Sequence, residues 1–218
     1  RMLGERIASL VPFEAQKLAA GAVILSPFIP LLFMGEEWGE TAPFLYFISH
    51  TDEDLVGAVQ EGRREEFAGF GWQEEPPDPQ SPETFERSRP DPGLREREPN
   101  RQLYGFYREL LRLRKELPAL ARPSKRRIET GFDEDARVVW ARRWNGDGAE
   151  AFLVFAFGEG EASPTLPLPA GRWTKVLDSA EERWGGPGSD APAEAESGGE
   201  VQVTVAGRSV VLYHTPLE

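Results

Sequence analysis

A short apolar run without polar interruption, Pro30-Leu31-Leu32-Phe33-Met34-Gly35, follows a helix-forming segment after only a few residues. The preceding residues 12–25 predict a helix, because Pro12 suits a first helical turn, Glu14 favours the N-terminal dipole and Pro27 ends the segment. An apolar run of this length without alternation is typical of a strand buried on both faces of a parallel sheet. Helix, short loop and buried strand together predict an α/β barrel or a doubly wound sheet.

Downstream of this run, residues 36–98 form a long and mostly irregular stretch with one predicted helix at residues 52–67. Loops of this length in compact domains are usually functional or disordered. Residues 100–117 then predict an amphipathic helix, because large apolar side chains recur every three or four residues until Pro118. The side chains expected to face the core are Leu103, Phe106, Tyr107, Leu110, Leu113 and Leu117.

After Pro123 the sequence changes to short segments with strand character. Strands are predicted at residues 137–145, 151–157, 172–177 and 201–215. Asn145-Gly146-Asp147-Gly148 is a hairpin signal between the first two. Residues 185–199, rich in small and polar side chains, predict a mobile loop. We therefore predict an α/β plus β organisation, in which residues 1–122 form the α/β part and residues 123–218 a small antiparallel β-sandwich.

Composition and charge exclude several classes of function. The 218 residues carry a net charge of −12 and show no basic stripe among aromatic residues, so we expect no nucleic-acid binding. Cysteine is absent, which rules out disulfides and thiol chemistry, and two distant histidines with scattered carboxylates predict no metal site. No glycine-rich phosphate loop follows a strand, so nucleotide binding is not indicated, and we expect no cofactor. The apolar residues 18–33 are too few, and too interrupted by prolines, to span a membrane.

The segment that carries chemistry is Phe33-Met34-Gly35-Glu36-Glu37-Trp38-Gly39-Glu40. If residues 31–34 form a barrel strand, the residues after it stand at the C-terminal face, where barrel active sites are built. Carboxylates there can accept hydrogen bonds from sugar hydroxyls, and Trp38 can stack on the apolar face of a pyranose ring. The alternative interpretation is that Glu36 and Glu40 are solvated loop charges and that Trp38 caps the core.

In these residues the sequence resembles the malto-oligosyltrehalose trehalohydrolases, a family of glycoside hydrolases of the α-amylase type. The resemblance rests on the segment from Leu31 to Phe44, followed by Phe47 and His50, and on residues 61–67, 77–80 and 84–85 in the same order. The opening Arg-Met-Leu-Gly-Glu-Arg also resembles the residues directly after the family's Asn-His-Asp-Gln motif. Specific motifs cover residues 1–122, and beyond them only the layout is compatible.

The resemblance implies the C-terminal end of a (β/α)8 barrel followed by an antiparallel β-sandwich domain. It also implies retaining cleavage of the α-1,4 bond next to the terminal trehalose unit of maltooligosyltrehalose, which requires a carboxylate nucleophile and a carboxylic general acid. The family's catalytic carboxylates map to no position of this chain, so we predict no catalytic residue here and an inactive isolated chain. The expected partners are maltooligosyltrehalose or another α-glucan and the upstream part of the same enzyme, in the cytoplasm and without a membrane. Without that upstream part, residues 1–122 should expose unpaired strand edges and aggregate or remain partly unfolded.

The candidates for substrate contact are, in order, Glu37, Trp38, Glu36, His50, Arg63 and Arg1. Glu37 is the candidate for hydrogen bonds to trehalose hydroxyls. For Arg63, an ion pair with Glu61 or Glu66 is the competing interpretation.

Two rival functions remain open. A glucan branching or debranching enzyme would carry a similar glycine-glutamate turn. A fragment of such an enzyme could therefore not be distinguished from this chain by that one motif. A non-catalytic carbohydrate-binding module would instead need the tryptophans of the β region exposed in a row, whereas burial in the sheet is their competing interpretation. These tryptophans are Trp140, Trp144, Trp173 and Trp184.

Overall fold

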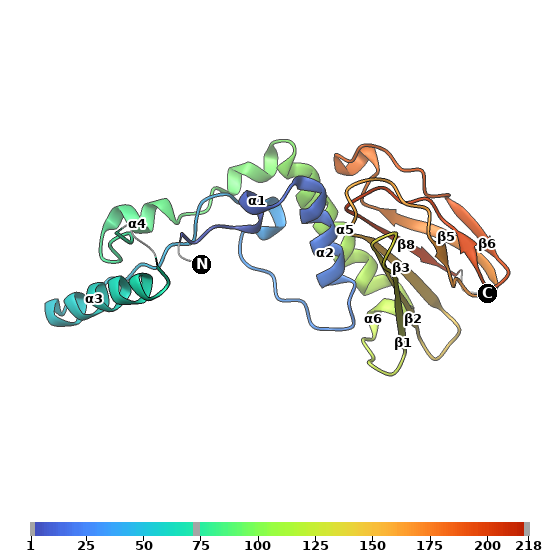
Figure 1. Ribbon diagram of the computed structural model, residues 1–218, viewed down its shortest axis with the longest axis horizontal. Helices are drawn as coiled ribbons and strands as arrows, with labels where there is room; N and C mark the ends of the chain where they lie inside the picture. The colour runs from blue at the N-terminus through green and yellow to red at the C-terminus, as the bar shows by residue number, and fades with distance from the viewer. Residues whose placement is uncertain (1–2, 72–74, 216–218) are drawn as a thin grey trace.

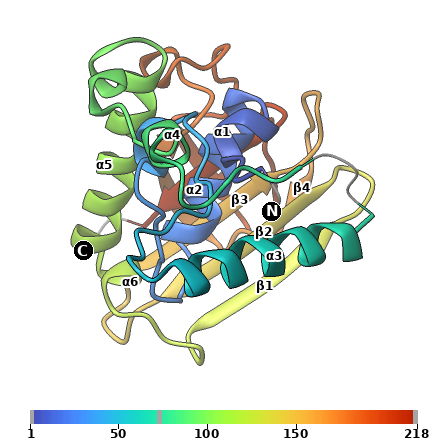
Figure 2. The ribbon, with the colours of Figure 1, turned by 90° about the vertical axis from the view of Figure 1, so that its left-hand side faces the viewer.

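The computed structural model describes residues 3–71 and 75–215 of the chain. The molecule is elongated, with helices α3 (Glu53–Gly69) and α4 (Pro82–Arg87) at one end, a helical layer in the middle and a β-sheet at the other end (Figure 1). Seen from the helical end, α3 runs across the front of the molecule with α4 beside it (Figure 2). The predicted helix at residues 52–67 is therefore confirmed, and it belongs to an arm that extends away from the rest.

Six strands form one antiparallel sheet in the order β1-β2-β3-β8-β5-β6. The strands are β1 (Ile128–Asp133), β2 (Val138–Trp144), β3 (Glu150–Ala156), β5 (Gly171–Asp178), β6 (Glu194–Ser197) and β8 (Ser209–His214). A smaller antiparallel pair consists of β4 (Thr165–Leu166) and β7 (Val201–Gln202). The predictions of an antiparallel sheet and of a hairpin between β2 and β3 are both confirmed. In that hairpin the Asn145 side chain accepts from the amides of Asp147 and Ala149.

The two faces of the sheet are buried in two separate apolar clusters. Along β3, Ala151, Leu153 and Phe155 join the cluster under the helices, and the alternate residues of the strand join the other cluster. The period of two in a strand sends successive side chains to opposite faces. Helices α2 (Phe13–Ile24), α5 (Asn100–Glu116) and α6 (Pro118–Ala121) therefore cover one face, and residues of the β4–β7 pair contribute to the cluster on the other.

Helices α2 and α5 pack closely on the sheet, as the predicted apolar stripe of α5 requires. Leu103, Phe106 and Leu110 are buried in the cluster that also holds Leu212 of β8. The approach is closest at Gly21 of α2, where an added Cβ would lie 2.7 Å from Cγ1 of Val210. The small residues of α2 thus serve to bring this helix directly onto strand β8.

Polar side chains fasten both ends of α2 to the segments around the sheet. The ammonium group of Lys17, fully buried, donates to the carbonyls of Ser179 (2.6 Å) and Trp184 (3.1 Å). At the other end, the buried guanidinium of Arg143 on β2 donates to the carbonyl of Leu25 at 2.7 Å. A single apolar cluster therefore includes residues from both sides of position 122, and the division into domains at 122/123 stays a prediction.

The predicted buried strand at residues 31–34 is not a strand in this structure. Residues 31–33 have no regular secondary structure, Met34 lies in a turn, and the segment pairs with no strand among the residues that the structure describes. Ile29 and Leu31 are 92% and 90% exposed. A strand requires a hydrogen-bonded neighbour, and an apolar pattern alone does not provide one. The prediction of a strand at residues 31–34 is therefore wrong for this chain. The apolar composition instead indicates a surface that would be stabilised by burial against another segment.

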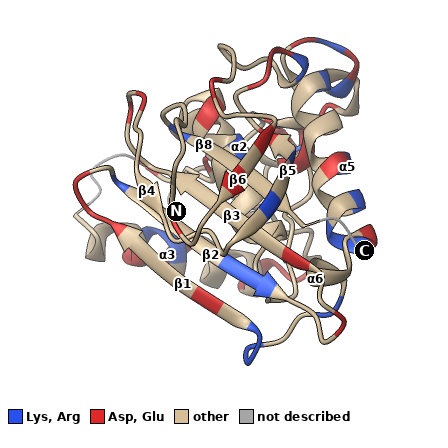
Figure 3. Ribbon diagram, turned by 90° about the vertical axis from the view of Figure 1, so that its right-hand side faces the viewer, with Lys and Arg blue, Asp and Glu red and all other residues tan. Residues whose placement is uncertain are grey.

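Two further differences lie in the β region. The predicted mobile loop at residues 185–199 contains strand β6, which pairs with β5 and buries Ala195 opposite Trp173. The sequence does not predict strand β1, because half of its residues are exposed, none is fully buried, and its alternation is weak. In the ribbon of Figure 3, acidic and basic residues are interspersed along the strands and loops.

Candidate functional site

The Phe33–Glu40 motif folds into a tight turn around the short helix η1 (Glu36–Trp38). Gly35 before it and Gly39 after it have φ values of 89° and 68°, in the left-handed region that favours glycine. At Gly35 an added Cβ would also lie 2.7 Å from the Cβ of Glu40. The amide of Glu40 donates to the carbonyl of Gly35 at 2.9 Å and closes the turn. Both glycines are therefore needed to present the three residues between them.

The three carboxylates of the turn have different surroundings. Glu36 accepts from the phenol of Tyr107 on α5 (2.9 Å) and from the amide of Phe33 (3.2 Å). Glu37 accepts from the amide of Gly35 at 3.0 Å, and it is half-buried. Burial and the neighbouring Glu36 carboxylate raise the pKa of Tyr107 far above its usual range, so its phenol remains a donor.

Glu40 is the most deeply buried of the three, at 1% exposure. Its Oε1 accepts from the amides of Thr41 (2.9 Å) and Ala42 (2.8 Å). Its Oε2 accepts from the amide of Asp91 (2.6 Å) and from the indole Nε1 of Trp38 (3.2 Å). These four bonds occupy the acceptor capacity of the carboxylate. The interpretation of Glu40 as a solvated loop charge is therefore wrong.

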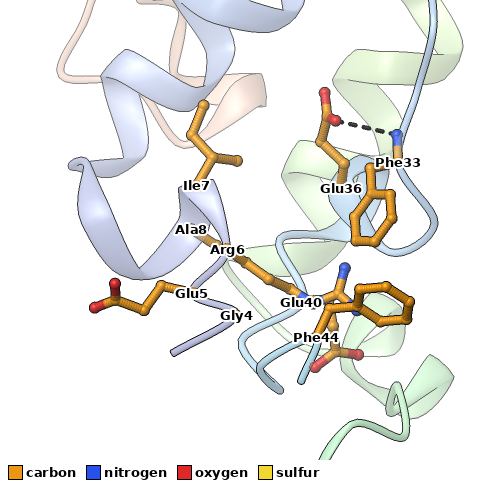
Figure 4. Close-up of a pocket in the computed structure, with 9 residues that line it drawn as sticks. All are labelled: Gly4, Glu5, Arg6, Ile7, Ala8, Phe33, Glu36, Glu40 and Phe44. Carbon is orange, nitrogen blue, oxygen red and sulfur yellow. Dashed lines mark hydrogen bonds between the residues drawn. The ribbon is translucent and has the colours of Figure 1, made fainter. Parts of the chain in front are cut away.

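A pocket of about 460 Å³ lies between residues 4–8 and this turn, with the rings of Phe33 and Phe44 on one side (Figure 4). The guanidinium of Arg6, at 6% exposure, donates to the carbonyls of Met34 (2.7 Å), near the start of the turn, and of Ala42 (2.5 Å), just after its end. It also lies over the ring of Phe33, 4.9 Å from the centroid. Arg6 thus ties the N-terminal segment to both ends of the turn.

The predicted site residues fall into two places. Glu36, Glu37 and Trp38 come together in the turn, against α5. Arg63 lies on α3 in the extended arm, paired with Glu66 at 2.5 Å. His50 is exposed, and its backbone is hydrogen-bonded to the side chain of Gln80. Arg1 lies outside the described residues.

The guanidinium of Arg63 is engaged on several sides. Besides its ion pair with Glu66, it lies 5.0 Å from the ring centroid of Tyr46 and 4.8 Å from that of Phe67. This is the geometry that the ion-pair interpretation predicts. A sugar contact would have to be made by the remaining donors of the same group.

The tryptophans of the β region form no exposed row. Trp173 is 1% exposed and donates to the carbonyl of Pro169 at 2.9 Å. Trp140 is stacked on Phe152, 5.5 Å between ring centroids, and Trp184 packs edge-on against Phe106. Trp140, Trp144 and Trp184 are each half-buried.

Sequence reasoning missed three residues that support the turn. Tyr107 belongs to the predicted core stripe of its helix, and its phenol reaches Glu36 from there. The side chain of Asn100 donates to the carbonyl of Trp38 at 2.7 Å, and Arg6 binds both flanks of the turn. In the sequence these three residues are noticeable only as polar or amphipathic side chains within an apolar pattern. That pattern does not identify the groups to which they bind.

Two properties expected from the sequence can be compared with the structure. Within residues 3–71 and 75–215, no group of three or more histidine, aspartate or glutamate side chains is arranged to hold a metal ion. Over the same ranges, every helix is too short or too polar to cross a bilayer.

Known proteins share this arrangement of helices and sheet. The family model described as the alpha amylase C-terminal all-beta domain matches residues 131–216. A putative α-amylase from Salmonella typhimurium superposes with a TM-score of 0.74 at 28% identity, over 99% of this chain and 33% of that chain. The α-amylase from H. orenii gives a TM-score of 0.55 at 17% identity, over 94% and 36%, which shows the fold alone. The chain therefore carries the all-β C-terminal domain of the α-amylase family of glycoside hydrolases.

Curated relatives narrow this class further. The malto-oligosyltrehalose trehalohydrolase of Arthrobacter ramosus is 41% identical over 172 residues, which cover 78% of this chain and 26% of that protein. Those of Rhizobium sp. (strain M-11) and Deinococcus radiodurans are 41% and 39% identical, over 72% and 73% of this chain and 26% of each protein. The resemblance to the C-terminal part of the malto-oligosyltrehalose trehalohydrolases is confirmed. The chain spans about a quarter of the length of these relatives.

Proposed function

We propose that this chain is the C-terminal part of a glycoside hydrolase that cleaves the α-1,4 bond next to the terminal trehalose unit of maltooligosyltrehalose and releases trehalose. The observation that carries the proposal is the identity of 37% to 41% with relatives that bear the name trehalohydrolase, over 59% to 78% of the chain. The nucleophile and the general acid of such a retaining hydrolase then lie in the upstream part of the same enzyme. The isolated chain is inactive on this proposal.

The exposed segment 29–34 supports the barrel part of the proposal. In a complete (β/α)8 barrel this segment is the last strand, and its neighbours belong to the upstream part of the enzyme. The exposed side chains of Ile29, Leu31 and Met34 are then buried against those strands and the helices outside them. The turn that follows stands at the C-terminal face, where the active site is built.

Within that site, Glu37 and Trp38 are the residues proposed to contact substrate first. Glu37 retains acceptor capacity beyond its bond to Gly35, which suits hydrogen bonds from sugar hydroxyls. The half-buried indole of Trp38 offers a face for stacking on a pyranose ring. Glu36 lies beside them, and His50, Arg63 and Arg1 are proposed as outer contacts with the substrate.

The experiment starts from the natural protein. Intact-mass spectrometry of the gene product is followed by an assay for trehalose release from maltooligosyltrehalose. A product several times heavier than 24.3 kDa that releases trehalose supports the proposal. A natural product of 24.3 kDa without activity contradicts it.

Two rival functions give different results in related assays. A branching enzyme cleaves α-1,4 bonds and forms α-1,6 bonds, a debranching enzyme hydrolyses α-1,6 bonds, and neither releases trehalose from maltooligosyltrehalose. A binding module retains maltoheptaose without any hydrolysis, and substitution of the half-buried Trp184 abolishes its binding whereas substitution of Trp38 does not; Trp173, at 1% exposure, offers no surface to a glucan.

A further inference from the structure

We infer that Glu40 is a positioning residue that orients the indole of Trp38 for stacking on a glucosyl ring. This inference rests on the proposed function and assigns one part of the motif to a supporting task. Glu40 thus differs in role from Glu37, which has the same charge, lies three residues away and is proposed to contact the substrate directly.

The first step of the argument is the fixation of Glu40 itself. Three of its four hydrogen bonds come from backbone amides, two from Thr41 and Ala42 and one from Asp91, far along the chain. Backbone amides in closed turns cannot rotate away, so the carboxylate is held in one orientation before it meets the indole. At 1% exposure it has no surface left for a substrate.

The second step is the restraint on Trp38. Its Nε1 donates to Oε2 of Glu40 at 3.2 Å, and its backbone carbonyl accepts from the side chain of Asn100 at 2.7 Å. A Cβ added at Gly35 would lie 3.4 Å from Cζ2 of the indole, so the ring rests against that glycine. Backbone, ring edge and ring nitrogen are thus each held by a different partner.

A ring held in this way binds a sugar without losing rotamer freedom on association. Ordering one side chain at a binding site costs about 0.5–1.5 kcal/mol. Loss of the Glu40 contact should therefore weaken substrate binding through Trp38, with little effect on the bond-breaking step that upstream carboxylates perform. Weaker substrate binding with a nearly unchanged chemical step is the kinetic pattern expected of a residue that acts through another residue.

The test uses the full-length enzyme that contains this chain, with the single variants Glu40→Gln and Trp38→Phe and the double variant. The amide of glutamine keeps the size of the side chain but turns one acceptor into a donor. Phenylalanine keeps a ring but removes the indole N–H. We expect Glu40→Gln to raise KM for maltooligosyltrehalose about three- to tenfold and to change kcat less than twofold. In the Trp38→Phe background the same change should have no further effect on KM.

Opposite outcomes overturn the inference. An unchanged KM for Glu40→Gln contradicts it. So does a Glu40→Gln substitution that raises KM by the same factor in the wild-type and Trp38→Phe backgrounds. If Glu40 had a purely structural role, Glu40→Gln would lower the melting temperature in both backgrounds. Its effect on KM would then not depend on the residue at position 38. If Glu40→Gln fails to fold, Trp38→Phe and Trp38→Ala are compared: wild-type KM in the phenylalanine variant contradicts a tether through the indole nitrogen, and a raised KM supports it.

The proposed function and this inference fail separately. A wild-type enzyme that releases no trehalose refutes the proposed function. The same variants are then compared by calorimetric titration with maltoheptaose, and the coupling between positions 38 and 40 decides the inference on affinity alone.

Discussion

The contact between α2 and β8 permits a stability prediction of unusual direction. Replacement of a glycine inside a helix by alanine ordinarily stabilises a protein by about 1 kcal/mol. At Gly21 the new Cβ would lie 2.7 Å from Cγ1 and 3.2 Å from Cβ of Val210, which is fully buried in the centre of the sheet. Overpacking of this kind costs about 1–3 kcal/mol. We therefore expect Gly21→Ala to lower the free energy of unfolding by as much as about 2 kcal/mol, despite the better helix former.

A matched control lies in the neighbouring helix. Gly105 of α5 also faces a segment of the β region, but a Cβ there would meet Cζ3 of Trp184 at 3.5 Å, an ordinary contact distance. Gly105→Ala should therefore raise the free energy of unfolding by about 0.5–1 kcal/mol. Glycine-to-alanine replacement should therefore lower the free energy of unfolding at position 21 and raise it at position 105, although both helices pack in the same core.

Urea-induced unfolding of the full-length enzyme that contains this chain, followed by tryptophan fluorescence, measures both variants. The double variant Gly21→Ala/Val210→Ala adds a coupling measurement, because removal of the valine methyl groups opens the space that the new methyl needs. We expect the two changes to be less destabilising together than the sum of the single changes, by about 1 kcal/mol or more. A Gly21→Ala variant as stable as Gly105→Ala, or additive effects in the double variant, would refute the reasoning.

Three further predictions test other parts of the structure. Lys17→Met should cost about 2–4 kcal/mol of unfolding free energy, because it leaves the carbonyls of Ser179 and Trp184 without their buried donor; a loss below about 1 kcal/mol by urea titration would contradict this. Burial, with Asp178 nearby, raises the pKa of Tyr213 above its ordinary value of 10.0. Above pH 10 the unfolded chain loses this proton and the folded chain keeps it, so stability falls as pH rises, by about 1.4 kcal/mol per pH unit. Tyr213→Phe should remove that part of the alkaline slope in melts between about pH 9.5 and 11, and an unchanged slope would exclude the tyrosine as its source. Leu31→Ser should reduce aggregation of the isolated chain, measured by light scattering, because the side chain is 90% exposed; it should inactivate the full-length enzyme, and an unaffected enzyme would argue against burial of this segment in a barrel.

The helices and the central strands were predictable because their signals are local. The apolar stripe of α5 and the alternation in β3 each repeat within one segment, and both directly determine which side faces a neighbour. Strand β1 has no such signal. Its pairing with β2 places Gly131 under the ring of Trp140, where a Cβ would lie 2.4 Å from Cζ2, and a lone glycine does not indicate such a partner.

The candidate site was predictable as a segment, but its internal division was not. Three carboxylates within five residues look alike in sequence, and their roles depend on residues far along the chain. Tyr107 engages Glu36, and the amide of Asp91 engages Glu40, over separations of 71 and 51 residues. The strand at residues 31–34 was mispredicted for the same reason, because pairing depends on neighbours that a local pattern does not contain.

The core beneath the helices also bears on how such enzymes can be recombined. Helix α5, which holds the turn through Tyr107 and Asn100, shares one apolar cluster with β3 and β8. A chimera joined at residue 122 would combine the helical half of this cluster from one parent with the sheet half from another. Contacts as close as Gly21 against Val210 leave no tolerance for unmatched side chains. Exchange of the sheet between homologues should therefore succeed only when α2 and α5 are inherited with it.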